Sequence, residues 1–484
     1  MKIKDLLERS GVQLLSGGCG EEEITALTYD SRKAQTGSLF FCLRGARSNG
    51  EDFAPAAYAQ GCRCFVSEGT LDVPEDADVV RVSDARQALA QISAAFFGFP
   101  QRDVTIIGVT GTKGKTTVAE TACSVMNRIG LACGVIGSNG AAYAGKHVGT
   151  SNTTPESYEL MRLFRAMRDE GVRYVVMEVS SHALALERVR GITFRVGAFT
   201  NLTRDHLDFH RTMEDYCDAK AQLFRQCETA VCNGDDPWTP RLLRECACPV
   251  LRYGTGDSSR LRGENLRLTA RSVAFDALLD GRRIPVTVPI PGRFTVYNAL
   301  AALGICHMLG VPPEQGAAAL QTASGIKGRM EVVPTPGLPC TVLIDYAHTP
   351  DALENVLTAV RGFAEGRVVA VFGCGGARSR LRRFGMGSVC ARLADFCIIT
   401  EDNSRGEPVE HILADIRAGL RLGNPATPFA EIPDRRQAIY YALDHAQPGD
   451  IIAILGKGHE TTIERGGIKE PFVEREIVEE YWGR

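Results

Sequence analysis

The sequence lacks several features that would place it in whole classes of protein. No stretch approaches the roughly 18 apolar residues of a membrane-spanning helix, and the first residues interrupt their apolar positions with charges. The 55 lysines and arginines are balanced by 58 aspartates and glutamates, which argues against a broad nucleic-acid or polybasic membrane surface. Internal repeats and low-complexity segments are also missing. We therefore expect a cytoplasmic protein that acts on small molecules.

The 16 cysteines lack the spacing of a metal or redox motif. The closest pairs, Cys62/Cys64 and Cys246/Cys248, are separated by one residue, whereas zinc knuckles and redox motifs use two. We expect reduced thiols, most of which pack in the interior.

The most informative segment is residues 106–117, an apolar strand followed by a glycine loop and a helix start. Such a loop turns backbone N–H groups and a positive helix end toward one anion, while its lysine and hydroxyl contact phosphate and Mg²⁺. Val109 stands where the usual pattern has its first glycine. An ordinary glycine turn is the weaker interpretation. The sequence predicts a nucleotide site formed by Gly111, Thr112, Lys113, Gly114, Lys115, Thr116 and Thr117.

The length of 484 residues predicts about three domains. Residues 1–98 mix short strands with a helix over 85–97 and predict a small α/β domain. Residues 99–327 alternate apolar strands with amphipathic helices, which predicts a mainly parallel sheet, with an antiparallel extension over 251–290. The same alternation restarts in residues 328–484 and predicts a doubly wound, Rossmann-like domain.

Two polar side chains are expected beyond the carboxyl ends of central strands, where open parallel sheets bind ligands. Glu178 follows a strand over 174–177, and His206 follows one over 196–200. Together with Thr116 they are candidate Mg²⁺ ligands, because Mg²⁺ prefers carboxylate and hydroxyl oxygen. A less favoured interpretation is that Glu178 satisfies helix amides. A histidine beside Asp205 would be structural if seen alone, but its position after a central strand favours a role in the site.

The last third of the chain holds a second glycine loop over 372–378, which by itself is a weak signal. Arg378, Arg405 and residues 457–460 are expected at one sheet edge. There the arginines can bind a carboxylate and Glu460 can accept from an ammonium group, an arrangement that suits a zwitterion.

Two further segments have plain structural interpretations. From local sequence, Lys220 is a surface lysine on an amphipathic helix. Residues 345–351 form a strand-to-helix turn in which Thr349 caps the helix and Pro350 takes its first position.

Together these motifs closely resemble the Mur ligases, over essentially the whole chain. Residues 30–32, 152–155, 178–182, the Lys220 segment and residues 456–460 are similar to the branch of that family that adds the third peptide residue. The resemblance implies an ATP-dependent, ADP-forming ligase that joins a diamino acid to UDP-N-acetylmuramoyl-L-alanyl-D-glutamate. It also implies that residues 1–98 bind the UDP-sugar, 99–327 bind ATP and 328–484 bind the amino acid, closing over both other substrates.

The resemblance assigns roles to individual residues. The catalytic set is Lys115, Glu178, His206 and Lys220, with Lys220 carbamylated so that, beside Thr116, Glu178 and His206, it supports a second Mg²⁺. Further ATP contacts are Asn298, Arg329 and Asp345. The muramoyl dipeptide contacts are Ser31, Asn152, Thr153, Thr154, Ser180 and Arg188. The amino-acid contacts are Arg378, Asp402, Asn403, Arg405, Gly456 and Glu460.

The sequence departs from the family pattern at a few positions. Lys113, Leu186, the Ala46-Arg47 pair and Ser404 stand where the family commonly has Asn, Gln, His-Gln and Pro, and Ala377 and Ser379 replace two Asp residues. Arg378 and Arg405 favour meso-diaminopimelate, whose second carboxylate needs a cationic partner, over L-lysine or another amino acid. A folylpolyglutamate synthetase-like ligase and a binding or regulatory paralogue with weakened catalysis remain alternatives. We expect a monomer.

Overall fold

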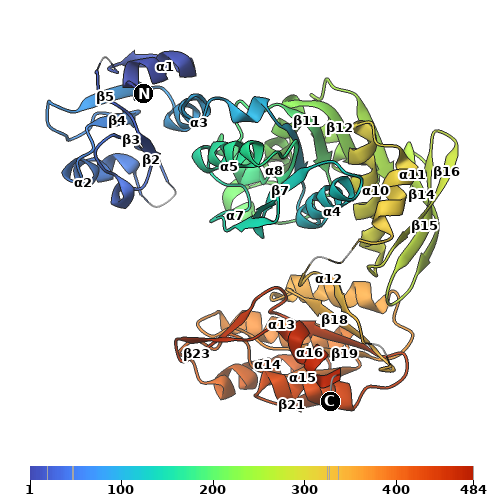
Figure 1. Cartoon of the computed structure of the whole chain (residues 1–484). Coiled ribbons are helices and arrows are strands. Elements are labelled where there is room, and N and C mark those ends of the chain that lie inside the picture. The colour runs from blue at the N-terminus through green and yellow to red at the C-terminus, as the bar shows by residue number, and fades with distance from the viewer. Residues whose placement is uncertain (19, 46–47, 324, 326, 336, 483–484) are drawn as a thin grey trace. The chain divides into compact units, whose positions relative to one another are not determined.

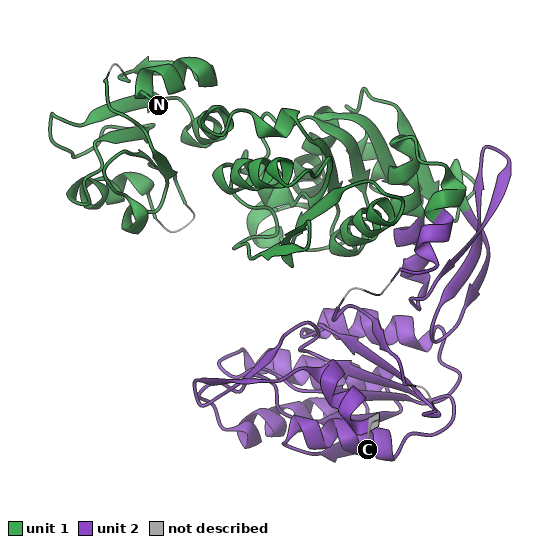
Figure 2. Cartoon of the chain, viewed as in Figure 1, with its two compact units in different colours: residues 1–262, 300–316 green, residues 263–299, 317–484 purple. Residues whose placement is uncertain are grey.

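The computed structural model of the chain describes residues 1–18, 20–45, 48–323, 325, 327–335 and 337–482. It divides into two compact units, Met1–Arg262 with Leu300–Gly316 and Gly263–Ala299 with Ala317–Arg484 (Figure 2). Within the described ranges, every helix is too short or too polar to cross a bilayer. The domain boundaries near residues 98 and 327 stay predictions.

The first part of unit 1 is the small α/β layer structure that the sequence predicts (Figure 1). Its strands lie in the order β1-β5-β4-β3-β2, with β1 alone antiparallel to its neighbour. Helices α1 and α3 cover one face and α2 the other. The elements are α1 (Ile3–Ser10), β1 (Leu14–Ser16), β2 (Ala26–Thr28), η1 (Ser31–Lys33), β3 (Ser38–Phe41), η2 (Gly50–Phe53), α2 (Ala54–Ala59), β4 (Cys64–Ser67), β5 (Asp78–Val82) and α3 (Ala85–Phe96).

The rest of unit 1 is built on a mainly parallel sheet in the order β14-β13-β12-β11-β6-β10-β7-β8-β9, and β14 continues from unit 1 into unit 2. The elements before the long loop segments are η3 (Pro100–Arg102), β6 (Thr105–Thr110), α4 (Lys115–Arg128), β7 (Cys133–Gly137), β8 (Gly140–Tyr143), β9 (Lys146–Val148), α5 (Ser157–Asp169), β10 (Tyr174–Glu178), α6 (Ser181–Ala185) and β11 (Phe194–Phe199). They are followed by α7 (Leu207–His210), α8 (Met213–Ala221), η4 (Gln222–Arg225), β12 (Cys227–Asn233), α9 (Thr239–Leu242), β13 (Val250–Gly254) and β14 (Leu261–Leu268).

The strand that carries the phosphate loop lies at the centre of this sheet. β6 pairs in parallel with β10 on one side and β11 on the other. All residues of β10 after Tyr174 are buried, as the continuous apolar runs of the sequence predict. The carboxyl ends of β6, β10 and β11 therefore share one edge, which is where ligands bind in such sheets.

The expectation for residues 251–290 was only partly correct. β13 and β14 run parallel to β12, not antiparallel, and β15 (Val273–Leu279) and β16 (Arg282–Val288) form an antiparallel hairpin in unit 2. Alternate burial along β15 reflects one solvated face. Such alternation occurs in any one-sided strand, so it did not determine strand direction.

The remainder of unit 2 is doubly wound, as predicted. Its sheet has the order β17-β18-β22-β19-β20-β21, parallel except for β17, with α12, α13 and α14 on one face and α15 and α16 on the other (Figure 1). The elements are α10 (Arg293–Met308), which continues into unit 1, α11 (Pro313–Leu320), β17 (Glu331–Val333), β18 (Thr341–Asp345), α12 (Pro350–Arg361), β19 (Val368–Phe372), α13 (Arg380–Leu393), β20 (Phe396–Ile399), α14 (Val409–Gly423), β21 (Phe429–Glu431), α15 (Arg435–Asp444), β22 (Ile451–Leu455), β23 (Thr462–Arg465), β24 (Ile468–Pro471) and α16 (Glu474–Trp482). Thr349 caps α12, since its hydroxyl accepts from Ala352 N at 3.3 Å.

The described cysteines are free thiols, and most are buried, as expected. Three of them, Cys227, Cys246 and Cys248, form a cluster that their spacing in the sequence does not predict. The Cys248 sulfur lies 3.4 Å from that of Cys246 and 3.6 Å from that of Cys227, at the start of β12. Burial raises the pKa of Cys246 to about 11, so this thiol stays protonated at neutral pH.

Candidate active site

The loop after β6 is shaped by a glycine that no other residue can replace. Gly111 has φ +145°, and a Cβ there would lie 1.9 Å from the Thr200 hydroxyl at the end of β11. The Thr200 hydroxyl and the Asn201 amide group also bond Lys113 O, at 2.7 and 3.0 Å. The loop is thus held against the neighbouring strand end, and Lys115 opens α4.

Two ammonium groups meet at one carbonyl of this loop. Lys115 Nζ and Lys220 Nζ donate to Gly111 O at 2.9 and 2.8 Å, and Lys115 also donates to Thr112 O at 2.9 Å. Lys220 comes from α8 and is 1% exposed, so the surface interpretation of this residue was wrong. The ring of Tyr216, one turn earlier on α8, lies beneath this ammonium group, with its centroid 4.5 Å from Lys220 Nζ.

Burial holds the pKa of Lys220 well below its usual value, and the charge of Lys115 lowers it further. At neutral pH a larger fraction of Lys220 is therefore in the neutral amine form than for an exposed lysine. The neutral form of a lysine is the one that reacts with electrophiles such as CO₂.

Thr116 and Glu178 form a pair of oxygen ligands beside the loop. The Thr116 hydroxyl donates to Glu178 Oε1 at 2.9 Å, and Ser138 N donates to the same oxygen at 2.8 Å. Octahedral Mg²⁺ with ligands at about 2.1 Å places adjacent oxygens about 3.0 Å apart, close to the observed separation. Glu178 is 1% exposed, and Thr116 and Glu178 together fit one Mg²⁺.

His206 lies at the start of α7, with φ +53°. Its ring centroid is 5.0 Å from that of His182 and 6.1 Å from that of Tyr216. Among the residues that the structure describes, no three His, Cys, Asp or Glu side chains form a group that could hold a metal. The predicted wider metal set of Glu178, His206 and Lys220 therefore stays a prediction that depends on carbamylation.

The predicted dipeptide contacts Thr154, Ser180 and Arg188 do meet. The buried Thr154 hydroxyl donates to Glu178 O at 2.9 Å and accepts from Ser180 N at 3.0 Å, while Arg188 Nη1 donates to Thr154 O at 3.0 Å. Arg188 also pairs with Glu156, which Arg86 reaches from α3 at 3.3 Å.

The remaining dipeptide candidates are Thr153, Asn152 and Ser31. The Thr153 hydroxyl lies 3.0 Å from that of Ser138. Asn152 is exposed and lines a cavity of about 150 Å³ together with Tyr29, two residues before Ser31 in η1. Leu186 ends α6. Ala46 and Arg47 lie outside the described residues.

The amino-acid candidates gather at one edge of the unit 2 sheet, as the sequence predicts. A Cβ at Gly375 would lie 3.6 Å from Arg405 Nη1 and 3.8 Å from Arg378 Cγ, so the two arginines flank the second glycine loop. Arg405 donates to Gly376 O at 2.6 Å. Across the same edge, Asn403 Nδ2 donates to Glu460 Oε2 at 2.9 Å.

This loop is held without the two aspartates that the family commonly has. Ala377 N donates to Glu407 Oε2 at 3.0 Å, and Arg383 pairs with the same carboxylate at 2.6 Å. Ser404, in place of the proline, is buried, and the next residue, Arg405, bonds Glu464 O through its N–H at 3.1 Å.

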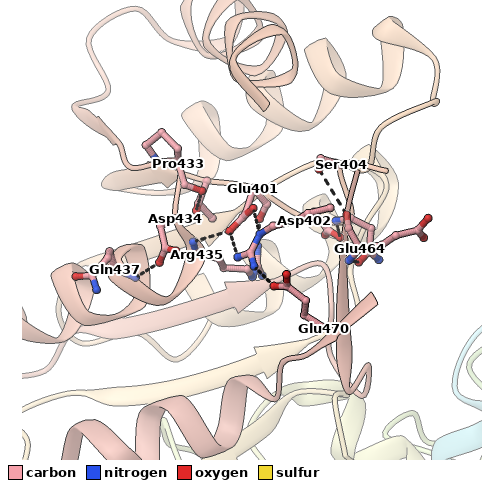
Figure 3. Close-up of polar contacts among 12 residues, drawn as sticks. Glu401, Asp402, Ser404, Pro433, Asp434, Arg435, Gln437, Glu464 and Glu470 are labelled. Atoms are coloured by element: carbon pink, nitrogen blue, oxygen red, sulfur yellow. Dashed lines mark hydrogen bonds and ion pairs between the residues drawn. The ribbon is translucent and has the colours of Figure 1, made fainter. Parts of the chain in front are cut away.

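A buried ionic network that the sequence does not predict lies behind these residues (Figure 3). Arg435, 0% exposed, pairs with Glu474 at 2.6 Å and donates to Glu401 O and Leu455 O at 3.1 and 2.8 Å. Arg465 adds bonds to Glu401. The network ties together the ends of β20 and β22. Asp402 and Gly456 follow those strands, with the Asp402 carboxylate 2.8 Å from where a Gly456 Cβ would lie.

The other ATP candidates belong to unit 2. The Asp345 carboxylate, 5% exposed, accepts from Met330 N and Ala347 N, both at 2.8 Å. Burial raises the pKa of Asp345, with these bonds opposing the shift. Arg329 is exposed over the Tyr346 ring, and Asn298 lies in α10. Their contacts with ATP stay predictions.

Comparisons with known proteins show the family to which the chain belongs. Models of the Mur ligase family, catalytic domain, the Mur ligase middle domain and the Mur ligase, glutamate ligase domain match residues 23–97, 109–306 and 328–458. Proteins named UDP-N-acetylmuramoyl-L-alanyl-D-glutamate–2,6-diaminopimelate ligase are 44% identical in Geobacillus kaustophilus, over 91% of both chains, and 39% in Clostridium botulinum, over 95% of both. A solved structure with that name has a TM-score of 0.75 at 30% identity, covering 99% of this chain and 98% of its own. The chain belongs to the Mur ligase family.

Proposed function

We propose that the protein joins meso-diaminopimelate to the D-glutamate γ-carboxylate of UDP-N-acetylmuramoyl-L-alanyl-D-glutamate, with ATP as the energy source, during peptidoglycan precursor synthesis. The observation that carries this proposal is the similarity to ligases of that name over nine-tenths or more of both chains. The chemistry below follows from the residues at the two sheet edges.

The first step activates the acid. A carboxylate does not react with an amine at neutral pH because its leaving group is poor. A γ-carboxylate oxygen therefore attacks the γ-phosphorus of ATP, the bond to ADP breaks, and an acyl phosphate forms. Lys115 and the N–H groups of the glycine loop neutralise the charge that develops on the phosphoryl oxygens.

Thr116 and Glu178 are the residues that would hold Mg²⁺, which neutralises phosphate charge when bound. Lys220 supports carbamylation because it is buried and its pKa is depressed. Carbamylation converts the Lys220 ammonium, which repels the Lys115 ammonium, into a carbamate anion, which attracts it. Thr154, Ser180 and Arg188 bind the muramoyl dipeptide near this edge.

The second step forms the amide. The neutral amine of the incoming amino acid attacks the acyl carbon, phosphate leaves and the nitrogen loses a proton. Arg378 and Arg405 bind the carboxylate of the stereocentre that does not react, and Glu460 accepts from its ammonium group. Lysine has no second carboxylate for these arginines, which is why diaminopimelate is favoured over it.

Two other functions would use the same fold. The N-terminal sheet, β1 to β5, speaks against a folylpolyglutamate synthetase-like ligase, because the relatives that cover it act on a UDP-sugar according to their names. A weakened paralogue is disfavoured by the intact set of Lys115, Glu178 and Lys220. A monomeric state and a cytoplasmic location stay predictions.

The test is phosphate release from ATP in the presence of the UDP-muramoyl dipeptide and one of several amino acids. We expect release to require both, and meso-diaminopimelate to give the highest kcat/KM. Equal or better use of L-lysine would overturn the substrate assignment. Release with folate and glutamate, or none with any amino acid, would support one of the alternatives instead.

A further inference from the structure

A fully buried lysine lies behind the amino-acid edge of unit 2. Lys457 follows β22, and its side chain is 0% exposed. Its ammonium donates to Glu460 Oε2 at 2.7 Å and to Asn403 Oδ1 at 3.1 Å. A buried cation is stable only when such partners compensate for its lost hydration. Lys457 therefore constrains both partners, while it cannot itself reach a ligand from solvent.

The three side chains form a closed triangle. Asn403 Nδ2 donates to Glu460 Oε2 at 2.9 Å, while Asn403 Oδ1 also accepts from Glu464 N at 3.0 Å. Reversing the amide would place its NH₂ group against the Lys457 ammonium and the Glu464 N–H, so the orientation is fixed. The Asn403 amide and the Lys457 ammonium both donate to Oε2 of the Glu460 carboxylate.

The backbone that carries Lys457 is equally constrained. Gly456 adopts φ +120° and donates its N–H to Asp345 O at 3.0 Å. The preceding residue, Leu455, accepts from the buried Arg435. Arg435 also bonds the carbonyl of Glu401, two residues before Asn403 (Figure 3). Lys457 and Asn403 thus project from two strand ends that one guanidinium holds together.

We propose that Lys457 is a positioning residue for the incoming amino acid, holding Glu460 and Asn403 in the orientation that binds it. This rests on the proposed function, in which those two residues contact the amino acid. Glu460, 30% exposed, is the member of the triangle that reaches the ligand. Lys457 occupies Oε2, which leaves Oε1 for the ligand's ammonium group.

The test is a comparison of KM values for wild type, Lys457→Met, Glu460→Gln and the double variant. Methionine keeps the length and volume of the buried chain without its charge. We expect Lys457→Met to raise the KM for diaminopimelate about tenfold or more, with the KM for ATP changed less than twofold. Because Lys457 acts through both Glu460 and Asn403, we expect the Lys457→Met change to have less than its full effect in the Glu460→Gln background.

The matched control lies at the other end of the same strand. Asp450, 2% exposed, precedes β22 and pairs with Arg367 at 2.6 Å. Asp450→Asn removes a buried charge pair, so we expect a lower Tm and an unchanged KM for diaminopimelate. The double variant Lys457→Met/Glu460→Gln leaves neither charge of its pair unpaired, which keeps the comparison with Glu460→Gln possible if the single variant does not fold.

Two results would overturn the inference alone: an unchanged KM for diaminopimelate in Lys457→Met, or a full additional KM effect of that change in the Glu460→Gln background. Failure of the proposed function has a different signature. In that case the wild type itself shows no phosphate release that depends on diaminopimelate, and this inference falls with it.

Discussion

The phosphate edge of unit 1 and the amino-acid edge of unit 2 compensate buried cations in different ways. At the first, the buried Lys220 donates to the Gly111 carbonyl. At the second, the buried Arg435 and Lys457 donate to the carboxylates of Glu474 and Glu460. A carbonyl dipole compensates a full charge less well than a carboxylate does. The first edge is therefore suited to a polyanion, and the second to preset recognition of a zwitterion.

Lys115→Ala should give the largest effect, since it removes the ammonium assigned to the transferred phosphoryl group. We expect kcat to fall at least about 10³-fold, with Tm and circular dichroism close to wild type. The matched control is Lys146→Ala, an exposed lysine of β9 that pairs with Glu170. Substantial turnover in Lys115→Ala would contradict the assignment of the unit 1 edge to the phosphates of ATP.

Glu178→Gln tests the oxygen pair at the phosphate edge. We expect kcat to fall about 10²-fold and the Mg²⁺ concentration for half-maximal activity to rise, because an amide oxygen is a weaker Mg²⁺ ligand than a carboxylate. Mg²⁺ titrations of phosphate release measure both. Glu170→Gln, an exposed carboxylate on the same unit, serves as the control. An unchanged Mg²⁺ requirement would argue against Glu178 as a ligand.

Arg405→Ala tests the amino-acid edge. Loss of a charge-assisted contact should raise the KM for diaminopimelate about 10- to 100-fold while the KM for ATP stays constant. Arg417 on α14 forms a partly exposed ion pair with Glu431 of β21, and Arg417→Ala should change neither value. Equal shifts in both KM values would show that Arg405 supports the fold rather than the amino acid.

A half-buried acid that forms no ion pair with the residues described provides the smallest and sharpest test of charge compensation. Glu159 accepts from the Tyr29 hydroxyl at 2.8 Å, and its other oxygen is buried without a hydrogen bond among the described residues. Burial raises the pKa of Glu159. The charged carboxylate therefore lowers the free energy of unfolding at high pH, and this effect is absent below about pH 4.5, where the group is protonated in both states.

Glu159→Gln should therefore raise Tm by about 1 °C at pH 8, and the gain should vanish as the pH falls through the pKa of Glu159. Thermal unfolding of both proteins from pH 8 to pH 4.5 measures the difference. A gain that is independent of pH would reflect packing, not charge.

The sequence predicted the parts of the fold that local patterns determine. Strand β10 is an apolar run that ends at Glu178, and the Gly111 to Lys115 loop and the Thr349 cap each lie within a few residues of sequence. The direction of β13 and the burial of Lys220 depend on neighbours far along the chain. The Tyr216 ring and the Gly111 carbonyl make α8 bury its lysine, and a hydrophobic pattern that treats lysine as polar cannot detect this.

The candidate site shows the same division. The motifs identified Thr116, Glu178, Arg378 and Arg405, and the structure brings them together in two groups, while their roles stay predictions. The sequence did not predict a role for Arg435, because this residue lies at the start of α15 with no motif around it. Its partners come from α16 and from the strand ends of β20 and β22. Only the folded sheet places a guanidinium between those strand ends.

The central claim is that a γ-phosphoryl group passes from ATP to a carboxylic acid, and oxygen transfer tests it most directly. The UDP-muramoyl dipeptide labelled with ¹⁸O in the D-glutamate γ-carboxylate is turned over once with ATP and diaminopimelate, and the released phosphate is examined by mass spectrometry. The account predicts one labelled oxygen in each phosphate. Phosphate without label, with amide formed, would contradict it.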